Sequence, residues 1–219
     1  MSRRANISVV VFFFAITSVF GQGLKFGVFF DPAFIKFKSD AKDVVADDKF
    51  SMGFDLGMST DYYFSQNYAV ATGISLLNTR GTLTYENGIK NFHTKDGNIE
   101  IEPGSKIKYN VQYVKIPLGL KFKTHKIGRM VYSANPGLDF ITRASAKASF
   151  KDEKNASVNK EIKFFNMGWH FMLGASYSLG GEAAILGGLS FMNTFVDMTA
   201  PMHDKITSQN LFLCIGLIF

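Results

Sequence analysis

The sequence predicts an all-β fold, an eight-stranded antiparallel up-and-down transmembrane β-barrel. Three observations support this prediction. Apolar residues alternate with small or polar residues through eight segments, and a period of two is typical of strands with two different faces. Long and short connections between these segments alternate. The chain ends on an uncharged apolar strand, residues 210–219, whose free edge would invite aggregation unless the sheet closes into a barrel.

The composition fits one domain or one small barrel. The chain has 219 residues with 15% aromatic content and 23 Phe, and its net charge is +6. The basic residues are scattered among acids, so the sequence does not indicate nucleic-acid binding. The single cysteine, Cys214, excludes an internal disulfide and any multi-cysteine metal site.

The N-terminus has the pattern of a secretory signal peptide. Arg3 and Arg4 precede an apolar run over residues 7–20, and Val19 and Gly21 occupy the −3 and −1 positions of a cleavage site. The alternative, a membrane anchor, needs a longer apolar run. The sequence therefore predicts a signal peptide over residues 1–21 and a barrel domain over residues 22–219.

The first three segments show the alternation clearly. The first covers residues 24–31, and Pro32 is expected to interrupt it because proline cannot donate to a ladder. The second, residues 50–62, places large apolar residues on one face and Gly, Ser and Asp on the other. Small polar residues suit the inside of a narrow barrel, whose apolar outside meets lipid. The third, residues 68–85, has Ala, Gly and Ser on the inner face.

The fourth segment, residues 107–122, changes phase along its length. The residues expected outward are Ile107, Tyr109, Val111 and Tyr113, followed by Val114, Ile116, Leu118, Leu120 and Phe122. A change of phase within a continuing strand predicts a β-bulge near Tyr113 and Val114. This assignment places Lys108, Asn110 and Gln112 inward.

The last four segments alternate without interruption. They begin at Met130, Phe165, Glu182 and Asn210, and Gly180-Gly181 is a hairpin turn signal. We expect the residues that contact lipid to include Phe54, Leu56, Trp169, Phe171, Leu189, Leu213 and Ile215.

The connections are polar and alternate in length. Four long stretches are interpreted as loops outside the cell: residues 38–49, 86–106, 146–160 and 197–208. Short turns and both termini would then face the periplasm, which is the layout of a bacterial outer-membrane barrel.

The lumen is expected to hold charges of both signs. These are Lys25, Asp31, Asp55, Asp61, Lys115, Lys121, Asp139, Arg143 and Glu182, and His170 lies among them. Unpaired charges are costly to bury, so we expect an internal salt-bridge network, with a proton or ion path as the alternative.

Four histidines are the candidates for acid–base chemistry: His93, His125, His170 and His203. A histidine in a loop or turn is usually solvated, and an inward one is more often structural than catalytic. No Ser/His/acid spacing, phosphate-binding glycine loop or metal-spaced cluster stands out. The sequence therefore predicts no catalytic residue, no cofactor and no metal.

Residues 111–122 resemble a strand of the PorT-like outer-membrane β-barrel family of Gram-negative bacteria. The matching positions are Tyr113, Ile116, Pro117, Leu118 and Lys121. The resemblance implies a small eight-stranded barrel without enzymatic signature, in a family of which one branch is implicated in protein secretion.

We therefore expect an integral outer-membrane protein, a monomer, with a structural or protein-interaction role in the cell envelope. Its expected partners are outer-membrane lipid and other envelope or secretion proteins. Two alternatives stay open: a lipid-modifying enzyme in the same fold, and a soluble lipocalin-like binder of apolar ligands. The second requires the large apolar faces to point inward.

Overall fold

A computed structural model describes residues 23–40, 43–95, 97–150, 153–198 and 206–219. The expected signal peptide (residues 1–21) and His203 lie outside these described residues.

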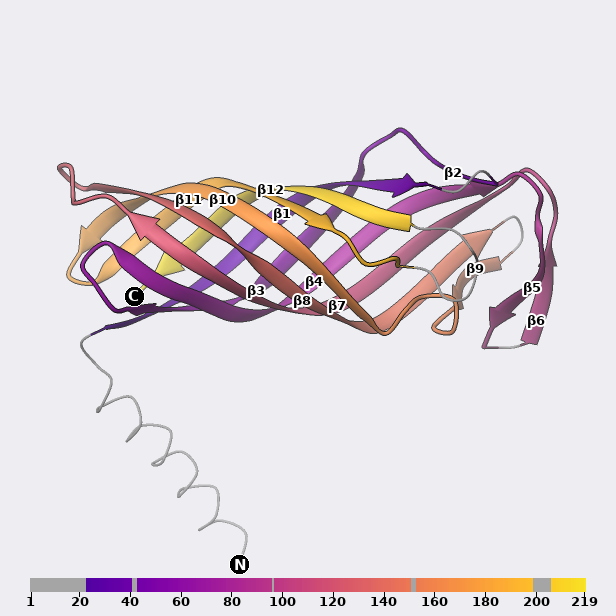
Figure 1. The fold of residues 1–219 in the computed structure, drawn as a ribbon, viewed down its shortest axis with the longest axis horizontal. Helices are drawn as coiled ribbons and strands as arrows, with labels where there is room; N and C mark the ends of the chain where they lie inside the picture. The colour runs from indigo at the N-terminus through magenta and orange to yellow at the C-terminus, as the bar shows by residue number, and fades with distance from the viewer. Residues whose placement is uncertain (1–22, 41–42, 96, 151–152, 199–205) are drawn as a thin grey trace, which may run out of the picture.

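Eight strands form the wall: β1 (Leu24–Ser39), β3 (Ser51–Tyr63), β4 (Tyr68–Tyr85), β7 (Ser105–Lys123), β8 (Met130–Phe150), β10 (Phe165–Gly180), β11 (Ala183–Thr194) and β12 (Ile206–Ile218). Each pairs with the next in the chain, and β12 pairs with β1 to close an antiparallel barrel, as predicted (Figure 1). Within the described residues, no helix is long and apolar enough to cross a bilayer.

The closure removes the free edge of the last strand. Val28 lies opposite Leu217 in the β1–β12 ladder. The backbone of Phe26 and that of Phe219 exchange two hydrogen bonds of 2.9 and 2.8 Å. The apolar C-terminal strand therefore has a paired neighbour on both sides, β1 and β11.

Four shorter strands lie at one end of the barrel, where the long connections are: β2 (Val44–Ala46), β5 (Ile89–Thr94), β6 (Gly97–Ile101) and β9 (Glu153–Ser157). β2 pairs with β4, β9 pairs with β8, and β5 and β6 form a separate hairpin (Figure 1). We call these four strands the cap. The short turns and the C-terminus lie at the opposite end.

Three of the expected loops contain strands of the cap. Residues 38–49 contain β2, residues 86–106 contain the β5–β6 hairpin, and residues 146–160 contain the end of β8 and all of β9. These segments are polar overall, but a few apolar side chains, among them Phe92 and Ile101, are buried in the core. That burial holds the cap against the barrel interior.

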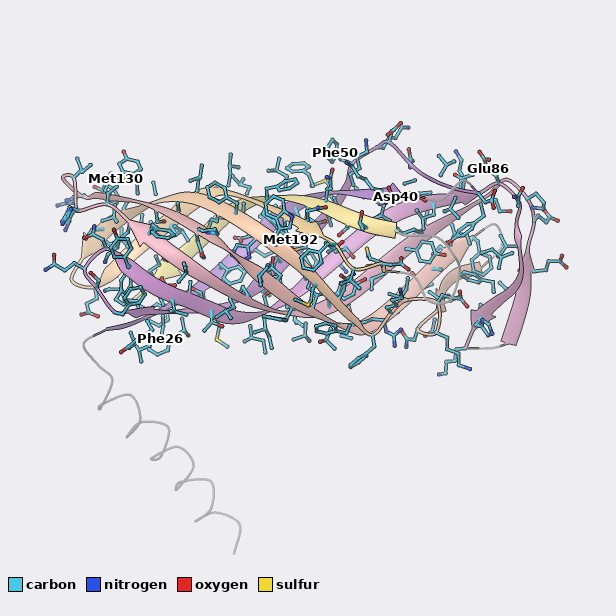
Figure 2. The ribbon with its side chains drawn as sticks, viewed as in Figure 1. Phe26, Asp40, Phe50, Glu86, Met130 and Met192 are labelled. Atoms are coloured by element: carbon cyan, nitrogen blue, oxygen red, sulfur yellow. The ribbon has the colours of Figure 1, made fainter. Side chains whose placement is uncertain are left out.

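The inside and outside faces agree with the prediction over most of the barrel. Large apolar side chains point outward around the wall, as at Phe26 (Figure 2). The set predicted to point outward does so: Phe54, Leu56, Trp169, Phe171, Leu189, Leu213 and Ile215. Asp55, Asp139 and His170 are buried inside.

Glu182 was expected in the lumen, and this prediction is wrong. Its side chain is 82% exposed, because Gly180 pairs directly with Ala183 and Glu182 therefore lies in the two-residue turn outside the ladder. The alternation that assigned it inward begins only at Ala183.

The predicted phase change in the fourth strand is also wrong. Ile107, Tyr109, Val111 and Tyr113 are buried inside the barrel, in phase with Lys115 and Lys121. Lys108 and Gln112 are exposed on the outer face, which Asn110 shares by alternation. The interior at this end is an apolar core, so a bulky apolar residue there does not indicate lipid.

The irregularity lies in the neighbouring strand instead. Gln112 pairs with Ser145, but Tyr113 pairs with Arg143, so Ala144 is the extra residue. The phase of β8 changes at this bulge, and Ala146 is buried where the earlier alternation would have exposed it.

The first strand continues through Pro32. Pro32 lies opposite Phe54 in the ladder with β3. On the other side, the ladder with β12 is interrupted between Phe29 and Ala33. The backbone N–H of Ile215 donates to the Asp31 carboxylate there, at 2.9 Å, which compensates for part of the missing ladder.

Candidate functional site

The barrel interior is divided into two halves along its length. The half next to the cap is filled by a continuous cluster of apolar side chains, including Ile35, Phe37, Leu83, Ile107 and Tyr109. Phe92 of the cap closes the top of this cluster and packs edge-on against Phe150, with ring centroids 5.9 Å apart. We call this cluster the interior plug.

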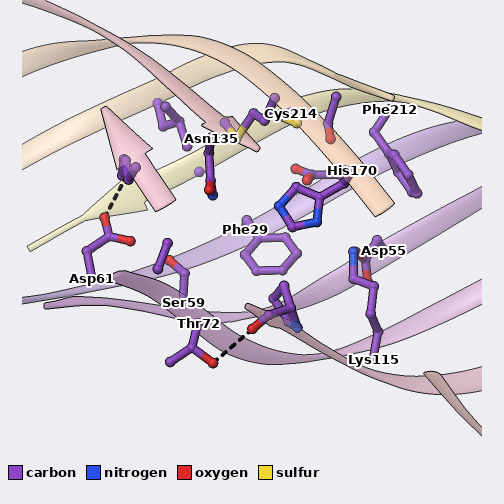
Figure 3. Close-up of a pocket in the computed structure, with 18 of the residues that line it drawn as sticks. Phe29, Asp55, Ser59, Asp61, Thr72, Lys115, Asn135, His170, Phe212 and Cys214 are labelled. Atoms are coloured by element: carbon purple, nitrogen blue, oxygen red, sulfur yellow. Dashed lines mark hydrogen bonds and ion pairs between the residues drawn. The ribbon is translucent and has the colours of Figure 1, made fainter. Parts of the chain in front are cut away.

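The half next to the short turns contains a cavity with about 850 Å³ of empty space, part of it open to solvent. Its polar lining includes Asp31, Asp55, Asp61, Lys115, Lys121, Asn135, Asp139 and His170 (Figure 3). Met192 and Phe212 also line it and belong to the interior plug, so they form its inner end. Inward side chains at the short-turn end, such as Ser133 and Ser176, are partly exposed, so the cavity opens toward that end.

Two lysine–aspartate pairs cross the inner face of β4. Lys115 of β7 pairs with Asp55 of β3, and Lys121 pairs with Asp61. β4 lies between these strands and presents only small residues to the lumen here, such as Ala71 and Ser75. That space lets the longer side chains of β3 and β7 meet, so the pairs confirm part of the predicted salt-bridge network.

A third pair joins β8 to β10. His170 Nδ1 lies 3.0 Å from Asp139 Oδ1, and both residues are buried. The Lys115 ammonium group also lies 5.2 Å from the centre of the Phe212 ring. Lys115 and its partner Asp55 are therefore fixed at the inner end of the cavity beside the interior plug, whereas the Lys121–Asp61 pair lies nearer the short turns.

The other predicted lumen charges lie elsewhere. Lys25 is at the mouth, 4.0 Å from the exposed Glu182. Arg143 donates to the backbone carbonyl of Ile162 at the cap end. The network is thus a set of local pairs and not one chain of charges through the barrel.

The structure separates the histidines. His93 pairs with Glu161 at the cap, with 2.7 Å between Nδ1 and Oε1, and His125 is exposed in the turn between β7 and β8. His170 is in the lumen, and no described serine or cysteine forms a hydrogen bond with it. Among the described residues, no group of three or more His, Cys, Asp and Glu could hold a metal ion.

The sequence pattern did not indicate the inner end of the cavity. Phe212 and Met192 fall on the inward faces of their strands, as alternation requires, but nothing in their type marks them as the end of a cavity. It also assigned Lys108, Asn110 and Gln112 inward, although they face outward beside the cap.

Comparison with known proteins identifies the fold. A family model described as "Outer membrane protein beta-barrel domain" matches residues 17–199. No curated protein matches the chain.

Several solved outer-membrane barrels are similar. Neisserial surface protein A is 12% identical, with 88% of this chain and 95% of that chain covered and a TM-score of 0.47. Ail of Yersinia pestis, bound to the heparin analogue sucrose octasulfate, is 14% identical with 90% and 100% covered and a TM-score of 0.43. The protease OmpT from Escherichia coli is 10% identical with 90% and 96% covered and a TM-score of 0.48. Similarity this low carries no functional argument.

Proposed function

Because the chain belongs to the outer membrane protein beta-barrel domain family, we propose that it is an integral outer-membrane protein of a Gram-negative envelope with a structural or protein-interaction role. In this proposal residues 1–21 are a cleaved signal peptide, and the short turns face the periplasm. The resemblance of residues 111–122 to the PorT-like family extends the proposal to a link with protein secretion.

The interior plug is the observation that carries this proposal. Ile35, Leu83, Ile107 and Val111 are fully buried across the barrel bore, and the cap covers them. A bore filled with buried apolar side chains does not suit a solute channel. It does suit a stable support for an exposed surface, because the cap is fixed to the wall by the same apolar cluster.

Two alternatives fit the geometry less well. A lipid-modifying enzyme needs its reactive groups to reach lipid, whereas His170 and Asp139 are buried on the inner face of the barrel wall. A soluble binder of apolar ligands needs the large apolar faces to point inward, whereas here they point outward, and the interior cavity contains buried ion pairs.

Recovery of partners from detergent-solubilised envelope tests the proposal. We expect the intact protein to fractionate with the outer membrane and to co-purify with envelope proteins. Reversing two exposed charges on and next to the cap, Lys95→Glu with Lys160→Glu, should weaken that recovery. The matched control at the short turns, Lys126→Glu with Arg129→Glu, should not weaken recovery of partners bound from outside.

Three results would count against the proposal. Recovery of the protein from the soluble periplasm without detergent would overturn the membrane assignment. If the cap variant and the wild type recover partners equally, the cap does not bind them in the way that we propose. A changed lipid A composition on deletion of the gene would favour the enzyme.

A further inference from the structure

Three exposed basic residues lie on the outer face of β4, β7 and β8, near the end of these strands that is next to the cap. Arg80 of β4 lies opposite Asn110 of β7, and Asn110 lies opposite Lys147 of β8. Lys108 follows two residues from Asn110 on the same face. Because neighbouring strands are about 4.8 Å apart, Arg80 and Lys147 are about 10 Å apart with Lys108 between and above them. We call these three residues the outer basic patch.

The outer basic patch forms no ion pair within the described part of the chain, although the exposed Asp47 adjoins β4 at Thr82. Arg80, Lys108 and Lys147 are exposed. None of them forms an ion pair with a described residue. The strands that carry the patch contain one acidic residue, Asp139, and it points into the lumen. Three cations without an ion pair on one face make a site for an anion.

On β4, the patch lies between the outward apolar residues and the cap. On β4 the last large apolar residues that point outward are Ile74 and Leu76, and Arg80 follows four residues later. At about 3.4 Å per residue and a tilt of about 40°, four residues raise the patch roughly 10 Å above Leu76, the last outward apolar side chain of β4. That height is the headgroup layer of the leaflet on the cap side.

We propose that the outer basic patch binds the phosphate groups of lipid A, the phosphorylated glucosamine lipid of the outer leaflet. The proposal rests on the outer-membrane placement of the barrel with the cap outside. Arg80 offers a planar fork of donors that can bind a phosphate in two places, and Lys108 and Lys147 add point charges within reach of the same group. The acyl chains would lie against Ile74, Leu76 and Ile116 directly below.

The position of the patch favours lipid over a soluble polyanion. Its side chains lie on the outer wall of the barrel and not on top of the cap, so a ligand reaches them from the side. The apolar surface that begins at Leu76 would be unused by a soluble sugar phosphate or sulfate. A lipid uses both surfaces at once.

The test compares two charge-matched double variants of the full-length protein. Arg80→Gln with Lys108→Gln removes one Arg and one Lys from the patch. Lys126→Gln with Arg129→Gln removes the same pair from the turn at the opposite end. Each protein is folded in detergent and titrated with bisphosphorylated or dephosphorylated lipid A, and bound lipid is counted by native mass spectrometry.

We expect the wild type to prefer bisphosphorylated lipid A. The patch variant should bind it about 30-fold more weakly and lose the preference, since each basic residue near a charged lipid surface contributes several-fold. The turn variant should bind like the wild type. Both variants must insert into lipid vesicles, so that a failure of membrane insertion is distinguished from a failure of lipid recognition.

The proposal is overturned if the patch variant keeps wild-type affinity, or if the two forms of lipid A bind the wild type equally. It is also overturned if inositol hexakisphosphate displaces the bound lipid at equal concentration, because the ligand would then be a soluble polyanion. The outer-membrane role fails separately, if the wild type itself does not insert into vesicles.

Discussion

Replacing Lys115 with methionine should destabilise the barrel strongly. Lys115 is the cation at the inner end of the cavity, where its side chain is 12% exposed and its partner Asp55 is 1% exposed. Methionine keeps most of the volume but removes the charge. Asp55 would then be a buried carboxylate without a cation, with Asp31 and Asp139 lining the same cavity.

The size of the effect follows from burial. Removing one partner of a buried ion pair typically costs about 3–5 kcal/mol, because the remaining charge is left desolvated. Lys25 provides the matched control, since its side chain is 33% exposed and lies 4.0 Å from a Glu182 side chain that is 82% exposed. An exposed pair is worth about 0–1 kcal/mol, so Lys25→Met should change stability little.

Urea unfolding in lipid vesicles measures both variants. The protein has one tryptophan, Trp169, which points outward from β10, so its fluorescence reports the loss of the lipid-facing surface. Adding Asp55→Asn to Lys115→Met should recover part of the lost free energy of unfolding. The reasoning is refuted if Lys115→Met costs no more than Lys25→Met, or if the second substitution restores nothing.

Three further results are expected. Leu213→Arg places a cation on the outer face of β12 and should cost roughly 2–4 kcal/mol if it lies near the midplane, measured as reduced insertion into vesicles against Leu213→Ala. In a Cys214→Ser background, Phe171→Cys should react with a bulky lipid-soluble maleimide while Ser176→Cys, which points into the barrel, stays unlabelled, and the reverse pattern would mean that the barrel is inside out. Gly81→Val should destabilise the interior plug by about 1–3 kcal/mol in the same urea assay, because a Cβ at Gly81 would overlap the Phe37 ring, whereas Thr82→Val on the outer face should be tolerated.

The sequence predicted the fold well because most of the wall separates its two faces by residue type. On β3, Asp55, Ser59 and Asp61 alternate with Leu56 and Met58, and only one assignment of inside and outside is reasonable for a barrel in lipid. The terminal strand and the alternation of loop lengths then fix the closure.

The same logic failed where both sides of the wall are apolar or both are polar. Ile107, Tyr109 and Val111 face the interior plug, and residue type alone cannot distinguish such a core from lipid. Their outward neighbours, Lys108 and Asn110, lie beside the headgroup layer in our proposal. Because both are polar, the sequence pattern assigned them to the lumen.

The cavity could be predicted in kind but not in detail. Mixed charges on inward faces indicated ion pairs, but the pairing of Lys115 with Asp55 depends on two strands that are not neighbours. Only the three-dimensional structure places them on either side of β4, with Ser75 small enough to let them meet.

The quenching of Trp169 by lipids with brominated acyl chains tests the central claim most directly. The claim is that the apolar face of the barrel meets lipid, and Trp169 is on that face, 41% exposed and packed beside Phe191. In vesicles of brominated phosphatidylcholine its fluorescence should fall strongly compared with unbrominated vesicles, while the aqueous quencher acrylamide should have little effect. Fluorescence that is insensitive to brominated lipid but quenched by acrylamide would contradict the account.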